Sequence, residues 1–265
     1  MYRGPHATRV LPPLALRALP WLFAAATVAL QITWAFLESP ARETFTTLVV
    51  ITFALASVLH AIVWRGVAWA LGFCVIVLGV AAGAEILGVN TGVPFGRYQY
   101  SDLLTPTVLS MPVIIPFAWL MMAYPAFIIA RALTNSWWSV ALVGALALTS
   151  WDLFLDPQMI GAGYWTWQEP GLPIAGLNEV PWTNLVGWFA VSLIMMLLLD
   201  LLPNQRASSL LPAALYIWSW LGGVVVNLLI FDRPFVALWG GVAMGVFGFA
   251  YMVRSLLSRE SPLAH

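Results

Sequence analysis

Two aspartates, Asp152 and Asp156, lie four residues apart at the end of an apolar segment, just before Pro157. Residues i and i+4 project from one face of a helix, so the two carboxyl groups are expected to lie side by side. An acidic side chain within a membrane helix is costly unless it faces a cavity or a partner, which makes the pair a candidate for proton transfer. The same spacing also fits two acids in water at a helix end, where Pro157 would terminate the helix.

A third acid and many aromatic side chains accompany this pair. Glu85 ends another long apolar segment, and the loops 89–107 and 157–182 are long and rich in glycine, proline and aromatic residues. Long loops of this kind often bind ligands, although tyrosine and tryptophan also favour membrane interfaces whatever the function. The candidate catalytic residues are Glu85, Asp152 and Asp156, and the candidate substrate-binding residues are Arg97, Tyr98, Tyr100, Tyr164, Trp165, Trp167, Asn178, Trp182 and Asn184.

The composition is that of an integral membrane protein. Hydrophobic residues make up 62% of the 265-residue chain and charged residues only 8%, against roughly 25% charged residues in a typical soluble domain. All 11 basic residues are arginines, so a Schiff base on lysine is impossible. The chain has no run of basic residues that could neutralise phosphates, so no nucleic-acid partner is expected. The lone Cys74 excludes an intrachain disulfide, and the three scattered histidines show no metal-ligand spacing, so no metal site is predicted.

Eight apolar segments are long enough to cross a bilayer, which takes about 20 mostly apolar residues. They lie near residues 19–37, 44–64, 67–88, 108–130, 136–156, 183–202, 210–230 and 234–254. Arginine is enriched in cytoplasmic loops, and all the arginines except Arg42, Arg97 and Arg233 fall on one side of this alternation. The sequence therefore predicts an all-α, polytopic bundle of about eight transmembrane helices. It forms a single membrane domain over residues 1–265 in the cell membrane, with both termini cytoplasmic.

This orientation gathers the candidate residues at one end of the bundle. Glu85, Asp152 and Asp156 all map to the non-cytoplasmic side, and the predicted site region spans residues 85–188. Pro112 and Pro116 fall in the outer half of the predicted helix 108–130, where each would remove a backbone hydrogen bond. Kinks at these prolines would open a pocket at the depth of the acids, although ordinary kinks of a membrane helix fit the same residues equally well.

Three motifs in this region resemble one protein family. The segments are TGVPFGRYQYSD (91–102), DLFLDPQMIGAGYWTW (152–167) and GLNEVPWTNLVGW (176–188). In this order they resemble the CruF-type carotenoid biosynthesis family, which includes the bisanhydrobacterioruberin hydratases. The resemblance implies a membrane hydro-lyase that adds water to the terminal double bond of an acyclic carotenoid, or a related isoprenoid lipid, and leaves a tertiary alcohol. It also implies that no cofactor is needed. Association with other carotenoid-pathway enzymes stays open.

Hydration of an alkene is compatible with these residues. An acid must protonate the less substituted carbon, and water then captures the tertiary cation. An apolar setting and a neighbouring acid favour the protonated form of a carboxyl group, and aromatic faces attract cations. The hypothesis is that Asp152 donates the proton and that Asp156 or Glu85 orients the water. The cation-stabilising wall would be formed by Tyr164, Trp165 and Trp167.

Two other functions fit parts of the sequence. Intramembrane prenyltransferases also use aspartates spaced D-x-x-x-D, but they bind a diphosphate through magnesium and normally have two acid-rich motifs with several basic residues. This chain has one such pair, with Arg97 as the nearby arginine. A non-catalytic carotenoid-binding or lipid-binding membrane protein is the other alternative. Substitution of Asp152 by asparagine would separate binding from catalysis.

Overall fold

The computed structural model describes residues 13–203 and 207–260, and eight helices make up most of this part of the chain. Each of the eight is long and apolar enough to cross a membrane. This confirms the predicted all-α fold class, whereas the side of the membrane that the termini face stays a prediction. The helices are α1 (Leu14–Trp34), α2 (Ala41–Arg65), α3 (Val67–Thr91), α4 (Ile115–Leu133), α5 (Trp137–Gly161), α6 (Trp182–Asp200), α7 (Leu210–Leu229) and α8 (Pro234–Glu260).

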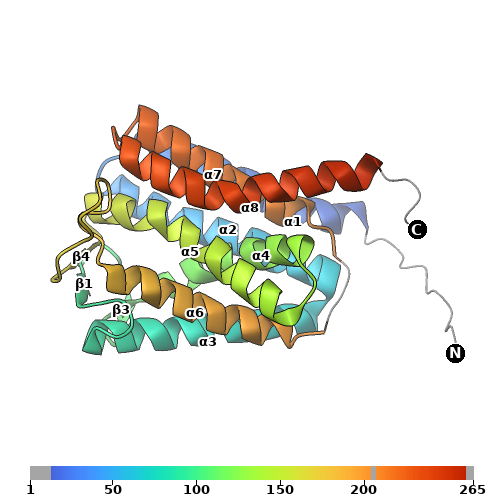
Figure 1. Cartoon of the computed structure of the whole chain (residues 1–265), viewed down its shortest axis with the longest axis horizontal. Helices are drawn as coiled ribbons and strands as arrows, with labels where there is room; N and C mark the ends of the chain where they lie inside the picture. Colours follow the sequence, from blue (N-terminus) through green and yellow to red (C-terminus); the bar gives the residue numbers. More distant parts are fainter. Residues whose placement is uncertain (1–12, 204–206, 261–265) are drawn as a thin grey trace, which may run out of the picture.

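The helices run along the long axis of the molecule in alternating directions (Figure 1). Helix α4 lies at the centre, where it packs against α2, α3, α5, α6, α7 and α8. In an apolar 18-residue stretch of this helix, 78% of the residues are buried, as expected for a helix that is hydrophobic on all sides. The carboxyl ends of α3 and α5 lie at the same end of the bundle, on the left in Figure 1. We call this the acid end, because it holds Glu85, Asp152 and Asp156.

Helix α4 begins later than predicted, at Ile115 instead of residue 108. The preceding residues form a hairpin of strands β2 (Thr107–Val108) and β3 (Met111–Pro112), and the two residues between the strands have positive φ angles. Pro112 therefore lies in a strand, and Pro116 lies in the first helical turn, where a missing N–H removes no intrahelical hydrogen bond. The predicted kinks at Pro112 and Pro116 are wrong. Pro125 remains inside α4.

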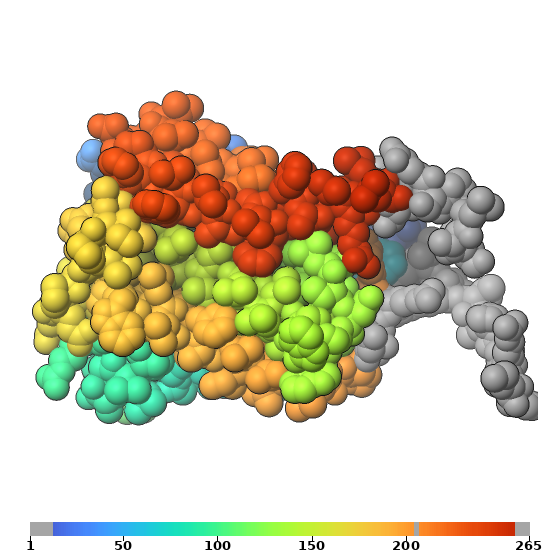
Figure 2. All heavy atoms as spheres, viewed as in Figure 1, coloured from blue at the N-terminus to red at the C-terminus, as the bar shows by residue number. Residues whose placement is uncertain are grey.

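A second small ladder joins the two long loops at the acid end. Strand β1 (Tyr98–Tyr100) pairs antiparallel with β4 (Trp165–Trp167), so Tyr98 lies opposite Trp167 and Tyr100 opposite Trp165. Side chains alternate between the faces of a strand, and the two residues between these aromatics, at positions 99 and 166, are exposed. All four aromatic side chains therefore share the inward face. In Figure 2 the yellow segment that contains β4 covers the left end of the bundle.

Helix α5 continues past Pro157 to Gly161 and does not end at Pro157 as predicted. Arg233, just before α8, donates a hydrogen bond from Nη1 to the Pro157 carbonyl oxygen at 2.6 Å. A cation is favourable at the carboxyl end of a helix, so this contact stabilises the final turn. As a result, Asp156 lies more than one turn before the helix end, and only 2% of it is exposed. The alternative of two water-exposed interfacial acids does not fit this burial.

Candidate active site

Asp152 and Asp156 meet the side chain of Asn184, which projects from the first turns of α6. The Asn184 Nδ2 atom donates to Asp152 Oδ2 at 2.9 Å and also to Asp156 Oδ2. Trp165 in β4 donates from Nε1 to Asp156 Oδ1 at 3.2 Å. All three polar residues of this group are at least 98% buried, so their hydrogen bonds form away from bulk water.

The shared Asn184 amide holds the two carboxyl groups close together, since each accepts a hydrogen bond from the same nitrogen. Two negative charges this close in a buried site would repel each other, so the arrangement favours a proton on one of the two carboxyl groups. Such a pair can keep one carboxyl group in the acid form in a buried site.

Glu85, in the last turns of α3, has a different environment. Its Oε2 accepts hydrogen bonds from the Tyr98 hydroxyl at 2.7 Å and the Tyr100 hydroxyl at 2.8 Å, and its Oε1 accepts from Trp119 Nε1 at 2.9 Å. Burial raises the pKa of Tyr98 and of Tyr100, and the adjacent Glu85 raises both further. The tyrosines therefore stay neutral donors. Three donors on two oxygens suit an ionised carboxylate.

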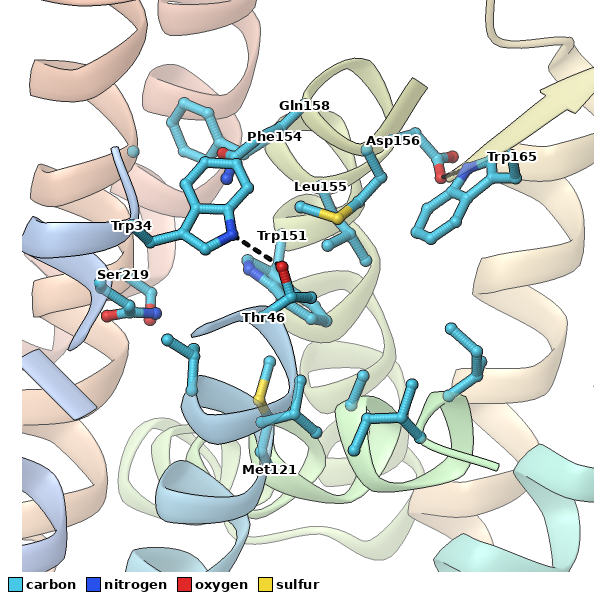
Figure 3. Close-up of a pocket in the computed structure, with 18 of the residues that line it drawn as sticks. Trp34, Thr46, Met121, Trp151, Phe154, Leu155, Asp156, Gln158, Trp165 and Ser219 are labelled. Carbon is cyan, nitrogen blue, oxygen red and sulfur yellow. Dashed lines mark hydrogen bonds between the residues drawn. The ribbon is translucent and has the colours of Figure 1, made fainter. Parts of the chain in front are cut away.

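The aspartate pair and Glu85 lie at one cavity of about 360 Å³. Asp156 and Glu85 line this cavity, whereas Asp152 is fully buried behind it and does not contribute to the wall. In Figure 3, Asp156 and Trp165 lie on one side, and Trp34 and Ser219 lie on the other. The wall is otherwise largely apolar, and none of the described residues that form it is basic.

Tryptophan side chains form much of the wall between these sides. Trp119 stacks on Trp188 with ring centroids 3.8 Å apart, and Trp151 meets Trp188 edge-on. Trp165 and Trp167 complete the aromatic surface near the acids. The face of an indole ring is electron-rich and attracts a cation. The cavity therefore combines proton donors and acceptors with surfaces that stabilise positive charge.

The structure brings most of the predicted site residues together, but not all of them. Glu85, Asp156, Tyr98, Tyr100, Trp165, Trp167 and Asn184 line the cavity, with Asp152 directly behind. Tyr164 is buried outside it, where its hydroxyl group lies 2.8 Å from Thr46 Oγ1. Arg97, Asn178 and Trp182 are exposed and outside the cavity wall.

Sequence reasoning missed several residues of the wall. Trp151 and Trp188 lie beside or within the quoted motifs, so their proximity to the acids was a usable signal. Trp119 lies in α4, far in sequence from any acid, and only the packing of α4 against α3 reveals its contact with Glu85. The contributions of α1 and α7 had no sequence signal either.

Substitution of Trp119 by phenylalanine is expected to destabilise the fold. Phenylalanine keeps an aromatic ring against Trp188 but removes the N–H that Glu85 Oε1 accepts. Loss of a hydrogen bond to a charged group costs about 1.5–3 kcal/mol, so the thermal unfolding temperature in detergent should fall by several degrees. Trp138→Phe is the control, because Trp138 is 59% exposed. Equal unfolding temperatures for the two variants would show that the Trp119 hydrogen bond contributes little.

Comparison with known proteins agrees with this picture. A family model described as carotenoid biosynthesis protein matches residues 45–248, which is more than half of the chain. A bisanhydrobacterioruberin hydratase of Haloarcula japonica is 30% identical over 123 residues, which cover 44% of this chain and 40% of that relative. The match therefore spans less than half of the relative's length. No solved structure shows significant similarity to the chain.

Proposed function

The chain belongs to the carotenoid biosynthesis protein family, and from this premise we propose that it hydrates the terminal double bond of an acyclic carotenoid. The product is a tertiary alcohol, and water is the only co-substrate. The observation that carries the proposal is the buried carboxyl pair, with Asp156 in the wall of an apolar, tryptophan-lined cavity and Asp152 behind it. The hydratase name of the Haloarcula japonica relative supports the same reaction.

Asp156 is the better candidate for the proton donor, because it lines the cavity and Asp152 does not. In the first step the carboxyl O–H bond of Asp156 breaks. The π electrons of the alkene take up the proton and form a C–H bond at the less substituted carbon. The more substituted carbon becomes a tertiary cation, and Asp156 becomes a carboxylate. Asn184 and Trp165 stabilise that carboxylate, since both donate hydrogen bonds to it. Asp152 accepts from the same Asn184 amide, which assigns it a positioning role in place of the donor role expected from the sequence.

In the second step, water attacks the cation and loses a proton to the Asp156 carboxylate, which restores the starting state. Glu85 supplies a negative charge in the same cavity, and this charge favours the cation over the neutral alkene. The faces of Trp119, Trp165 and Trp188 act in the same direction. Each proton and electron pair is therefore accounted for without another reactant.

Neither alternative function accounts for the residues of the cavity wall. A diphosphate substrate would need positive charge, and no arginine belongs to the wall among the described residues. A protein that only binds a carotenoid would not need a buried carboxyl pair, because an apolar ligand offers it no hydrogen bond. Neither alternative is favoured by a specific contact in the structure.

The decisive experiment is expression of the chain in cells that accumulate an acyclic carotenoid. We expect pigments that have gained the mass of one or two waters, detected by liquid chromatography and mass spectrometry, in cells with the chain and not in cells with an empty vector. Unaltered pigments despite membrane-inserted protein would contradict the hydratase. Pigments with an added isoprenoid unit would instead indicate the transferase.

A further inference from the structure

The cavity has a second arm that the proposed reaction does not use. This arm lies between α1 and α7, across from the acids, and Figure 3 shows Trp34 and Ser219 on that side. Apart from Gln31 and Ser219, its walls are formed by apolar side chains, the Trp218 ring and two glycines. The lining residues are Gln31, Ile32, Ala35 and Phe36 of the α1 side and Trp218, Ser219, Gly222, Gly223, Val225, Val226 and Ile230 of the α7 side.

The arm reaches the outer surface of the helix bundle. Ile32 is 51% exposed, Phe36 72% and Val225 52%, and all three line the cavity. Residues that both line a cavity and are exposed mark its opening, so the arm opens sideways between α1 and α7. The two helices are joined at the arm by a hydrogen bond from Trp218 Nε1 to Gln31 Oε1 at 2.7 Å.

The chemistry of the arm suits a hydrocarbon chain. A chain already dissolved in the bilayer loses little solvation when it moves sideways into apolar walls, whereas a polar group would lose its hydrogen bonds. The cavity volume of about 360 Å³ is near the lower limit for pockets that enclose a drug-sized ligand. A long chain whose end lies at Asp156 must therefore leave through an opening, and the arm between α1 and α7 provides one.

We propose that this arm binds the chain of a linear isoprenoid substrate while its terminal double bond lies at Asp156. The proposal rests on the proposed hydratase function and adds the site that selects a long, linear chain over a compact lipid. Gly222 is the residue that leaves the arm open. A Cβ at Gly222 would meet nothing closer than Trp218 at 3.7 Å, whereas one at Gly223 would meet the Phe154 ring at 2.9 Å.

The test is Gly222→Leu, which places a branched side chain in the arm without a backbone clash. Leucine also favours helix more than glycine does, so the helix is expected to form. Gly79→Leu is the matched control, because Gly79 is an exposed glycine of α3 with nothing within 4 Å and lies outside the cavity wall. With lycopene as substrate, Gly222→Leu should lower the hydration rate about tenfold or more, since a misfit of even one methylene group in an apolar pocket costs about 10–200-fold. The control should keep the rate of the unsubstituted protein.

A second measurement does not depend on turnover. A linear isoprenoid ether with a diazirine in the middle of its chain should, on illumination, label peptides within residues 31–36 and 218–230. Lycopene should compete with this labelling, and Gly222→Leu should abolish it. Three results would each overturn the proposal. They are equal hydration rates in Gly222→Leu and the unsubstituted protein, labelling confined to other helices, and labelling that is displaced by phospholipid but not by lycopene. If the unsubstituted protein shows no hydration but Gly222→Leu still blocks its labelling, the hydratase would be refuted and the chain-binding arm would be supported.

Discussion

Asp156→Asn is expected to abolish hydration while the protein still folds and binds carotenoid. Asparagine keeps the size of the side chain and one acceptor oxygen for Trp165 or Asn184, but an amide cannot act as the acid. General acid catalysis contributes about 10²–10⁴-fold to a rate, so the rate of product formation should fall by at least about a hundredfold. The measurement is the initial rate of water addition by purified protein, with carotenoid retention and thermal unfolding as checks on folding.

The control for this variant is Asp102→Asn, which removes an acid from the exposed part of the loop that follows β1. It should keep the full rate. Asp152→Asn discriminates between the two aspartates. If Asp152 positions Asp156, its substitution should lower the rate less than Asp156→Asn and shift the pH profile of the rate. A normal rate in Asp156→Asn together with no activity in Asp152→Asn would restore Asp152 as the donor.

The acid cluster was largely predictable because local spacing determines it. The i, i+4 spacing placed both aspartates on one side of α5, and the alternation of spans placed Glu85 at the same end. Asn184 lies in a quoted motif and proved to be the donor to both aspartates. What spacing cannot give is which aspartate faces the cavity. Residues four apart differ by about 40° around a helix with 3.6 residues per turn, and that difference separates Asp156 in the wall from Asp152 behind it.

The remaining features depend on contacts between distant segments. The continuation of α5 past Pro157 depends on a hydrogen bond from Arg233, 76 residues further along the chain. Strands β1 and β4 have three residues each, too few to give a periodic signal, and their pairing aligns the aromatics that cover the acids. Arg97 and Asn178 in the two long loops and Trp182 at the start of α6 are exposed instead. Residue type alone could not separate the two groups, because tyrosine and tryptophan suit a membrane interface as well as a site.

Glu85→Gln is expected to have the second-largest effect, through charge and hydrogen bonding together. Glutamine has the same shape, but its amide NH₂ cannot accept a hydrogen bond, so it must face at least one of the donors Tyr98, Tyr100 and Trp119. Leaving a buried donor unsatisfied costs about 1–3 kcal/mol, which should lower the unfolding temperature. The variant also lacks the negative charge opposite the cation, and loss of one such electrostatic contact costs about 10²–10³-fold in rate.

Rate and stability separate the two roles of Glu85. Glu179→Gln, in the exposed loop before α6, is the control and should change neither quantity. Glu85→Asp keeps the charge but shortens the side chain, so it should recover part of the rate even where its unfolding temperature stays low. A stable Glu85→Gln variant with the full rate would show that the carboxylate is not needed opposite the cation. A loss of stability with an unchanged rate would make Glu85 the residue that fixes the β1–β4 ladder over the acid end, and catalysis would then rest on the aspartate pair and the tryptophans alone.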